Sequence, residues 1–310
     1  MSIAVTILGN TSAKPTPTGH PSAQVVNINE QLFLVDAGEG VQRQMMRYGL
    51  SPLKLRAIFI SHLHGDHIFG VFPLLSTMGL YGRRTPLKIY APRPFGEMLE
   101  GFLRLFESDL PYTPEWVEVD TTKHRIIWEN DTTEVWTLRL RHRVPTAGYL
   151  FRQKEPALNV SKYAIDRYGL SVAQIVAAKR GEDITLDSGE RLSNSDITYR
   201  PYGTLAYAYC SDTNYSARLA KMVAGVDMLY HETTYAAAEK KIAKERGHAS
   251  TVDAAKVALT AGVGRLLIGH FSSRYKDLQP LVEECREIFP ASDIAEEGKT
   301  FLIEPKSHKQ

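Results

Sequence analysis

A dense group of polar side chains follows directly on the apolar, strand-like run 55–60. It reads, in order, Ser61-His62-Leu63-His64-Gly65-Asp66-His67. His62 and His64 point to the same side of an extended segment, and Gly65 lets the backbone turn and swing the next two polar groups round. Imidazole and carboxylate at this density indicate a metal site with room for two ions, which needs further ligands from elsewhere in the fold. The alternative is a polar surface turn.

Composition describes an ordinary globular protein. With 310 residues, 43% of them hydrophobic, the chain is long enough for one large α/β domain or two smaller ones. The formal net charge of +2 neither demands nor excludes a polyanionic partner, because nucleic-acid binding depends on how basic residues are placed. The two cysteines, Cys210 and Cys285, are too few for a disulfide framework, and no uncharged run approaches the roughly 20 residues of a membrane span. We expect a cytoplasmic protein without a membrane anchor.

Strand-like and helix-like segments alternate along the chain, and several strands follow one another directly, which predicts a mixed sheet. The helices are expected at 41–48, 94–107, 161–180 and 251–261, and the strands at 3–8, 24–28, 32–35, 55–60, 87–91, 116–119, 125–128, 133–142, 204–210, 226–230 and 265–269. The histidine cluster follows one of these strands. Ligands in open α/β sheets bind beyond the carboxyl ends of the strands, so this is a favoured place for a site.

His142 ends one of the predicted strands. In an extended segment 136–142 it shares a face with Trp136, Leu138 and Leu140, which is the apolar side. A lone histidine on such a face is more often a core residue satisfied by a hydrogen bond. A metal cluster elsewhere in the chain reverses that preference, and His142 becomes a candidate ligand.

The second half of the chain repeats the pattern of a strand followed by a polar group. Asp212 follows the strand 204–210, His270 follows 265–269, Glu232 lies just beyond 226–230, and His248 precedes the helix 251–261. Taken singly, an aspartate or histidine at such a position is as often a helix cap or a turn residue. Their recurrence favours one convergent site.

The segment His62-Leu63-His64-Gly65-Asp66-His67 resembles the H-x-H-x-D-H signature of the metallo-β-lactamase superfamily. Nearly the whole chain then resembles one branch, ribonuclease Z (tRNase Z). The motifs that carry the resemblance are Ile7-Leu8-Gly9, Asp36-Ala37-Gly38-Glu39-Gly40, Tyr209-Cys210-Ser211-Asp212-Thr213, His231-Glu232-Thr233-Thr234 and Gly269-His270-Phe271-Ser272-Ser273-Arg274-Tyr275. The last of these is the most diagnostic of the branch, since the core signature alone also admits lactamases, glyoxalase II and phosphodiesterases.

The resemblance implies an αββα sandwich over residues 1–310, with residues 152–200 inserted as an arm that forms the tRNA-binding exosite. It also implies a homodimer and two zinc ions per subunit. Carried over by position, one ion would be held by His62, His64 and His142, the other by Asp66, His67 and His270, with Asp212 bridging them. Two divalent cations about 4 Å apart activate a shared water and stabilise charge during displacement at phosphorus.

The resemblance also assigns roles around the ions. Asp66 would orient or deprotonate the attacking water, His248 would be the general acid and Glu232 would orient it. Arg274 is a candidate phosphate contact, with a structural salt bridge as the alternative.

The chain departs from the family pattern in three places. The arm of many bacterial members carries a Gly-Pro-rich stretch, and here the matching region 168–176 has no prolines, although 179–183 and 185–186 do match. Asp212-Thr213-Asn214 lacks the arginine that often follows, and Ala249 replaces the usual serine after His248. The first departure concerns how the arm grips tRNA, and the other two leave the candidate ligands intact.

The expected function is that of an endoribonuclease that removes the 3′ trailer from precursor tRNA and leaves a 3′-hydroxyl on the tRNA. A phosphodiesterase or exoribonuclease acting on other substrates is an alternative, since the same dinuclear centre would serve it. An RNA-binding member with an inactive site is a second alternative, against which the complete ligand set argues.

Overall fold

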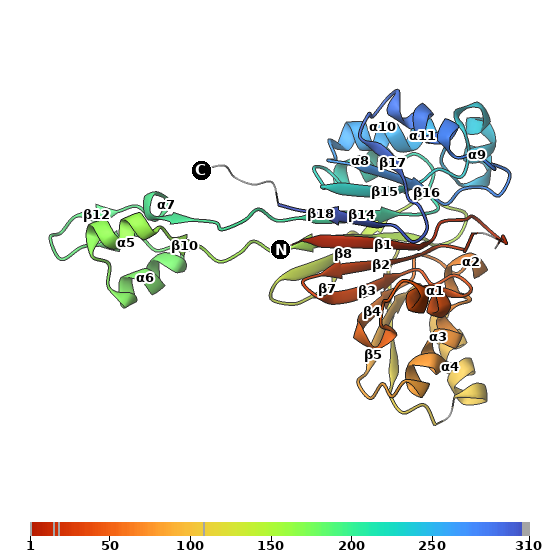
Figure 1. Ribbon diagram of the computed structural model, residues 1–310, viewed down its shortest axis with the longest axis horizontal. Helices are drawn as coiled ribbons and strands as arrows, with labels where there is room; N and C mark the ends of the chain where they lie inside the picture. The colour runs from red at the N-terminus through yellow and green to blue at the C-terminus, as the bar shows by residue number, and fades with distance from the viewer. Residues whose placement is uncertain (1, 15, 18, 108, 306–310) are drawn as a thin grey trace.

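The computed structural model describes residues 2–14, 16–17, 19–107 and 109–305. Two seven-stranded sheets lie face to face (Figure 1). The first runs, in spatial order, β18 (Thr300–Ile303), β1 (Ile3–Gly9), β2 (Ala23–Ile28), β3 (Gln31–Val35), β4 (Leu55–Phe59), β5 (Leu87–Ala91) and β6 (Pro114–Glu118). The second runs β17 (Ser292–Ile294), β16 (Leu266–Gly269), β15 (Met228–Glu232), β14 (Ala206–Cys210), β9 (Ala147–Gln153), β8 (Thr133–Arg139) and β7 (Ile126–Glu129).

Helices cover the outer face of each sheet (Figure 1). The first sheet carries α1 (Val41–Arg47), η1 (Pro52–Lys54), α2 (Gly65–Ile68), α3 (Val71–Leu80) and α4 (Phe95–Phe106). The second carries α8 (Ala217–Met222), η2 (Ala237–Glu239), α9 (Lys240–Arg246), α10 (Thr251–Ala261) and α11 (Gln279–Arg286). This order of layers confirms the predicted αββα sandwich. Among the described residues, no helix is both long and apolar enough to cross a membrane.

The central core lies between the two sheets and is rich in aromatic side chains. Phe59 stacks on Tyr90 with ring centroids 4.8 Å apart, and it meets Phe151 of the other sheet edge-on at 5.5 Å. Such a side chain contributes roughly 1.5 to 3 kcal/mol when it is fully buried. Strands with both faces covered read as nearly continuous apolar runs, and β4 is buried throughout except at Arg56. Two further apolar clusters lie outside this core. One packs the second sheet against its helices, and the other packs the first sheet against its helices.

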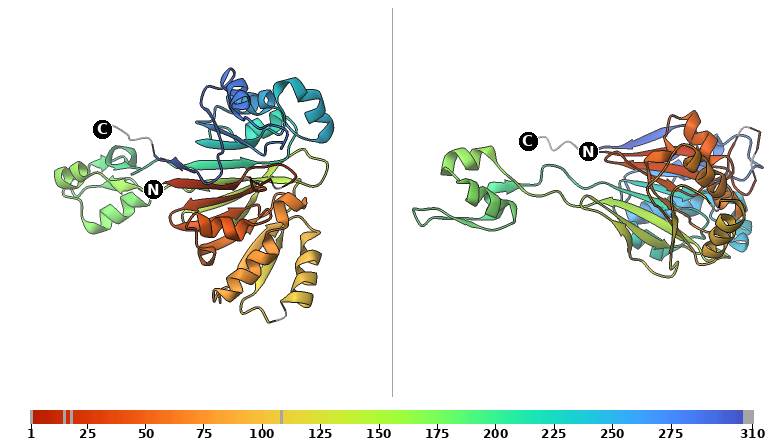
Figure 2. Two further views of the ribbon diagram at one scale, coloured as in Figure 1. Left: turned by 45° about the vertical axis from the view of Figure 1, so that its right-hand side comes forward. Right: turned by 90° about the horizontal axis from the view of Figure 1, so that it is seen from below.

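An arm projects from the sandwich between β9 and β14 (Figures 1 and 2). Its elements are β10 (Asn159–Val160), α5 (Lys162–Tyr168), α6 (Val172–Lys179), β11 (Ile184–Thr185), β12 (Arg191–Leu192), α7 (Asn194–Ile197) and β13 (Thr198–Tyr199). It has a small core of its own, which includes Ala164, Leu170, Ala178, Ile184 and Ile197. The sequence predicted one helical stretch over 161–180, whereas the structure has two helices there, α5 and α6. Gly169 ends α5 in the left-handed conformation, and Ser171 and Gln174 form a capping box that begins α6.

Parallel pairing brings the carboxyl ends of many strands to one edge of the sandwich. In the first sheet β3 pairs parallel with β4, and in the second β14, β15 and β16 pair parallel. β8 runs the same way as β14, because each is antiparallel to β9 between them. The loops that follow β3, β4, β8, β14, β15 and β16 therefore meet at this edge.

Two predicted strand ends were wrong. β8 ends at Arg139, so His142 lies three residues beyond the strand and its position does not follow from strand parity. β15 begins later and ends later than predicted, and Glu232 is its last residue instead of lying beyond it. Just beyond β8 the N–H of Arg141 donates to the hydroxyl of Thr213 at 3.0 Å, and just beyond β15 the N–H of Thr233 donates to the carbonyl of Gly269 at 2.8 Å. Contacts with distant parts of the chain, which propensity does not contain, therefore accompany both strand ends.

Candidate metal centre

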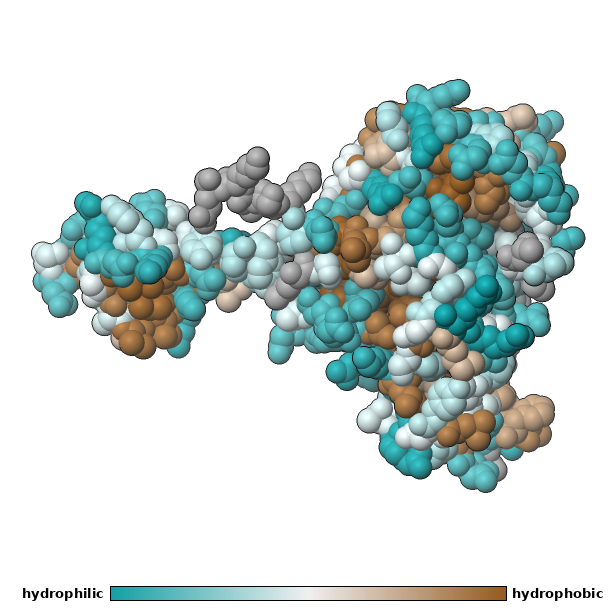
Figure 3. All heavy atoms as spheres, in the orientation of Figure 1, coloured by the Kyte–Doolittle hydropathy of each residue, from teal (hydrophilic) through white to brown (hydrophobic). Residues whose placement is uncertain are grey.

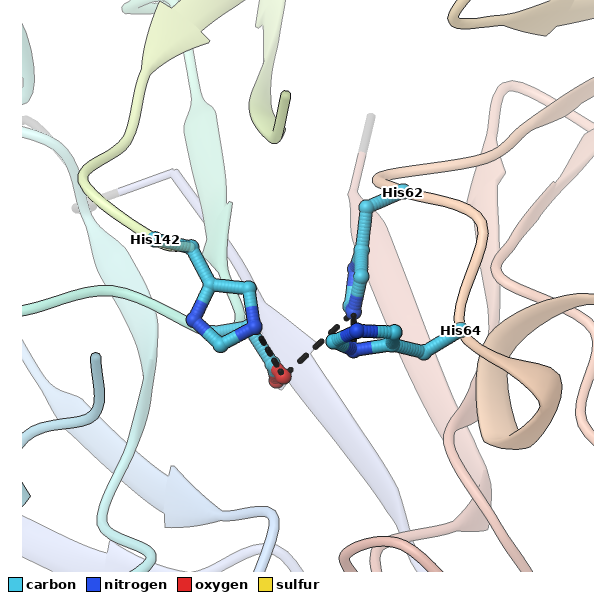
Figure 4. Close-up of side chains that lie close together, drawn as sticks. His62, His64 and His142 are labelled. Atoms are coloured by element: carbon cyan, nitrogen blue, oxygen red, sulfur yellow. Dashed lines mark hydrogen bonds and ion pairs between the residues drawn. The ribbon is translucent and has the colours of Figure 1, made fainter. Parts of the chain in front are cut away.

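Four of the predicted ligands form one compact group. The ligand atoms of His62, His64, His142 and Asp212 all lie within 4.8 Å of one another. His62 and His64 come from the loop after β4, whereas His142 comes from the loop between β8 and β9. Figure 4 shows the three imidazoles converging from these two loops, with His62 and His142 directed at the same carboxylate oxygen.

The other three predicted ligands form a second group beside the first. Asp66, His67 and His270 also place their ligand atoms within 4.8 Å of one another. Asp66 and His67 lie in α2, the short helix that begins at Gly65, and His270 follows β16 of the other sheet. The structure therefore brings together all seven residues that the sequence selected as ligands.

Asp212 joins the two groups. Its Oδ2 lies 3.4 Å from Nε2 of His62 and 3.6 Å from Nε2 of His142. Its Oδ1 lies 3.1 Å from Nε2 of His270 and 3.6 Å from Nε2 of His67. Each carboxylate oxygen thus faces one group, which is the arrangement that a bridging ligand requires.

Hydrogen bonds at the outer ring nitrogens fix the orientation of three of the histidines. Nδ1 of His67 donates to Asp36 at 2.7 Å, and Nδ1 of His142 donates to the carbonyl of Gly247 at 2.8 Å. Nδ1 of His270 lies 3.0 Å from the hydroxyl of Thr234. With Nδ1 occupied, the lone pair of each Nε2 faces the centre, as in the carboxylate–histidine–metal arrangements of known sites.

Asp36 is the residue that sequence reasoning missed, because Asp36 was noted only as the first residue of the motif Asp36-Ala37-Gly38-Glu39-Gly40 and received no role. Its carboxylate is completely buried and accepts from the N–H of Ser61 at 2.7 Å, the hydroxyl of Ser61 at 2.8 Å and the hydroxyl of Tyr209 at 2.6 Å, besides His67. The sequence contained one signal, since Asp36 directly follows the predicted strand 32–35. Only the tertiary structure shows that this strand, β3, is the parallel neighbour of β4, which leads into the histidine cluster.

Three aspartate and histidine residues at this edge adopt left-handed backbone conformations that favour glycine. The φ angles are 55° for Asp36, 43° for Asp212 and 58° for His270. Non-glycine residues held in this region cluster at functional sites, where the surrounding structure over-determines them. The backbone turns sharply as each strand ends, and this turn aims the side chain at the centre.

Burial and mutual charge set the protonation states of the two groups. Burial lowers the pKa of His62 to about 4 and also lowers that of His142. Burial alone would raise the pKa of Asp212, but the neighbouring imidazoles of His270, His62 and His67 hold it well below its usual range. Neutral imidazole and ionised carboxylate are the forms that bind metal ions.

The donor set fits divalent cations. Nε2 of His67 lies 3.4 Å from Nε2 of His270, so two ring nitrogens of the second group face each other. Within the described part of the chain, Nε2 of His142 is buried and has no hydrogen-bond partner. A cation between such atoms would satisfy them. Nitrogen and carboxylate donors in this mixture suit zinc, with sites left open for water and substrate.

His248 and Glu232 form a pair beside the metal centre. Nδ1 of His248 lies 2.9 Å from Oε1 of Glu232, which is fully buried. Glu232 also accepts the N–H of Thr213 at 2.8 Å and the hydroxyl of Thr234 at 2.6 Å. Burial disfavours the charged form of His248, yet the carboxylate of Glu232 outweighs it and raises the pKa of His248 to about 9. His248 also lies within 4.8 Å of Asp212 and His270, so geometry alone admits it as a ligand.

Arg274 lies at the cleft beside the centre and already has partners. Its guanidinium is ion-paired with Glu239, lies 5.0 Å from the ring centroid of Tyr235 and donates to Ser272 at 3.2 Å. The salt bridge that was the alternative to a phosphate contact is therefore present. The cleft has a volume of about 310 Å³ and is lined by Lys14, His64, His142, Arg143, Arg246 and His248, among others.

Two groups of nitrogen and oxygen donors joined by one aspartate, at the edge of an αββα sandwich, define a metallohydrolase of the metallo-β-lactamase fold. The crystal structure of the metallo-β-lactamase fold protein YhfI from Bacillus subtilis matches with a TM-score of 0.69 at 19% identity, over 97% of this chain and 100% of that one. The crystal structure of human tRNase Z, short form, matches with a TM-score of 0.68 at 24% identity, over 96% and 98% of the two chains.

Sequence comparison narrows the assignment. A family model described as Anti-Pycsar protein Apyc1 matches residues 3–152. Over 294 residues the chain is 40% identical to the ribonuclease Z of Porphyromonas gingivalis strain W83. The aligned region covers 95% of this chain and 97% of that relative. The chain therefore belongs to the ribonuclease Z family, the metal-dependent endoribonuclease branch of the superfamily, and the resemblance seen in the sequence is confirmed.

Proposed function

We propose that this chain is a zinc-dependent endoribonuclease that removes the 3′ trailer from precursor tRNA and leaves a 3′-hydroxyl on the tRNA. The observation that carries the proposal is the complete set of seven donors, with Asp212 shared between the two groups and the His248–Glu232 pair beside it. The family assignment names the substrate class, since the relatives are ribonuclease Z proteins.

His62, His64 and His142 would hold one zinc ion, and Asp66, His67 and His270 the other, with Asp212 bridging. Bound there, the two ions would supply Lewis acidity that activates a water and balances the charge that develops at phosphorus. Asp66 orients that water. The N–H of Ala13 donates to Oδ2 of Asp66 at 2.8 Å and holds the carboxylate in place.

His248 donates its proton to the leaving 3′-oxygen. Glu232 favours the protonated imidazole and fixes the ring through Nδ1, so that Nε2 carries the proton that the leaving group takes. Because Glu232 is itself held by Thr213 and Thr234, the pair stays in one geometry through the reaction. The product is a tRNA with a free 3′-hydroxyl and a trailer that keeps the phosphate.

The arm serves as the tRNA-binding exosite. Its surface combines exposed apolar side chains, Tyr163 and Val172 among them, with the guanidinium of Arg167, which lies over the rings of Tyr163 and Tyr168. Figure 3 shows apolar residues gathered on the arm. Aromatic rings and guanidinium planes are the groups on which unpaired RNA bases stack. This composition supports a grip that does not depend on a Gly-Pro-rich stretch.

The protein acts as a homodimer, in which the arm of one subunit helps to hold the tRNA. Phe69, Leu80 and Phe106 are 60%, 86% and 75% exposed and lie at the ends of α2, α3 and α4, on the outer side of the first sheet. Large exposed apolar side chains on one side of a molecule support an interface with a second copy. Precursor tRNA as substrate supports a cytoplasmic location.

The deciding experiment is incubation of the protein with a 3′-extended precursor tRNA, with and without a chelator, followed by mapping of the ends. We expect a single metal-dependent cut near the discriminator base. Stepwise trimming, or no cut together with turnover of a small phosphodiester, would support the phosphodiesterase or exoribonuclease alternative. Fewer than two zinc ions per subunit together with intact RNA binding would indicate an inactive RNA-binding protein.

A further inference from the structure

Two arginines stand on the same wall of the cleft as the proposed general acid. Arg143 directly follows His142 in the loop between β8 and β9, and Arg246 is the last residue of α9, two positions before His248. Both line the cleft. Although they come from different elements, Nη2 of Arg143 donates to the carbonyl of Glu245 at 2.9 Å, which draws its side chain along the end of α9.

Close packing fixes where this wall lies relative to the chemistry. A Cβ atom placed on Gly247 would lie 2.9 Å from Nδ1 of His142 and 3.3 Å from Cγ of Arg143. The same glycine offers its carbonyl to Nδ1 of His142. The backbone 245–247 therefore joins the candidate ligand His142, both arginines and the proposed acid His248 into one continuous surface.

The positive charge of this surface has no local counterpart. In the described ranges of the chain, no carboxylate forms an ion pair with Arg143 or Arg246, and the described lining of the cleft includes no aspartate or glutamate. Lys14 adds a third exposed cation at the opposite side, from the loop that follows β1. Arg274 differs, because Glu239 already neutralises it. Like charges held side by side without a carboxylate favour an anion between them.

We infer that Arg143 and Arg246 bind backbone phosphates of the tRNA 3′ end, on the 5′ side of the cut, and that they do so in place of Arg274. The inference rests on the proposed function. His248 gives its proton to the leaving 3′-oxygen, which belongs to the tRNA and not to the trailer. Because Arg246 and Arg143 share the wall of His248, the nucleotides that precede the cut run along this wall.

This assignment predicts a specific kinetic signature. Contacts to phosphates away from the reacting atoms bind substrate and transition state alike, so their loss raises KM with a much smaller change in kcat. Each lost contact to single-stranded backbone also reduces the slope of log affinity against log salt by about 0.7. A structural role for either arginine would instead lower thermal stability and leave the salt dependence in place.

The experiment uses the full-length, zinc-loaded protein and its variants R143A, R246A and the double variant, with R125A as control. Arg125 is exposed and lies outside the cleft, directly before β7, so the variant R125A removes the same charge from a different part of the surface. Kinetics of precursor-tRNA cleavage are measured over a range of salt concentrations. Two substrate series are compared: trailers of increasing length, and neutral methylphosphonate linkages placed singly on either side of the cut.

We expect KM to rise about 5- to 10-fold for each single variant and the salt slope to fall, with no such change in R125A. The rise in KM should be equal for short and long trailers. A methylphosphonate on the 5′ side of the cut should abolish the difference in KM between wild type and variant. Trailer-length dependence, or a difference abolished only by a 3′-side linkage, would overturn the assignment to the tRNA side. Unchanged KM and salt slope in an active protein would overturn the inference alone, whereas a wild type that makes no cut would overturn the proposed function with it.

Discussion

The hydroxyl of Thr234 links the His248–Glu232 pair to the metal centre: it donates to Oε2 of Glu232 at 2.6 Å and lies 3.0 Å from Nδ1 of His270. One buried side chain thus orients both the carboxylate that holds the proposed acid and a candidate metal ligand. Because this network is buried, the hydroxyl of Thr234 holds both side chains in one geometry. The proposed acid and the candidate metal centre are therefore linked through one side chain.

Replacing His248 by alanine should separate catalysis from metal binding. If His248 is the general acid, kcat for precursor-tRNA cleavage should fall by about 10²- to 10⁴-fold while two zinc ions per subunit remain. The measurement is single-turnover cleavage together with metal analysis of the same sample. Loss of one zinc would instead make His248 a ligand, which its distance from Asp212 and His270 also permits.

Glu232→Gln is the matched change to the partner of that acid. The imidazole remains, but it loses the carboxylate that lies 2.9 Å from Nδ1 and favours the protonated ring. We expect kcat to fall, by less than in H248A, with zinc content unchanged. A loss as large as that of H248A, accompanied by loss of zinc, would show that Glu232 supports the ligands rather than the acid.

Asp36→Asn should weaken metal binding although Asp36 is not a ligand. The amide keeps the shape of the side chain but removes the charge that holds Nδ1 of His67, and its NH₂ group cannot accept the hydrogen bonds made by the carboxylate oxygen that it replaces. Loss of such an outer partner typically costs 10- to 100-fold in metal affinity or activity. Zinc affinity is measured by competition with a chromogenic chelator. An unaltered affinity would show that packing alone orients His67.

Removal of the metal should lower stability as well as activity. Binding that favours only the folded state stabilises it by about 4 kcal/mol when free metal exceeds the dissociation constant 1,000-fold. We expect chelation to lower Tm by roughly 5 to 10 °C and to abolish cleavage, and added zinc to restore both. Scanning calorimetry with and without chelator checks this. A Tm that is insensitive to chelator would contradict metal binding by the two buried groups.

Deletion of the arm should weaken the processing of precursor tRNA without unfolding the sandwich. The arm has its own core, and its ends meet where Asn159 pairs with Tyr199, so a short Gly-Ser linker can replace residues 157–201. We expect turnover of bis(p-nitrophenyl) phosphate to persist while KM for precursor tRNA rises by at least about tenfold, because much of tRNA binding would be lost. Retained tRNA processing would remove the exosite role from the arm.

Much of the fold was accessible from the sequence because local signals agree with the final structure. The hairpin of β2 and β3, the strand β4 and the helix α10 follow from apolar runs and turn residues that need no distant partner. The predicted ends of β8 and β15 were wrong, because the contacts made where those strands end come from other parts of the chain. The helix predicted within 161–180 is interrupted by Gly169, whose turn a periodicity argument passes over.

The sequence by itself determined which atoms are available for chemistry. Seven nitrogen and oxygen donors were recognisable by residue type and by their place beyond predicted strands, and the family resemblance singled out His248 and Glu232. Only the tertiary structure decided how they act. Parallel pairing brings six loops to one edge, left-handed backbone at Asp36, Asp212 and His270 turns their side chains inward, and the packing at Gly247 sets two arginines beside the acid. The physical reason is that side-chain chemistry is a local property, whereas orientation, burial and unbalanced charge arise from contacts between residues far apart in the chain.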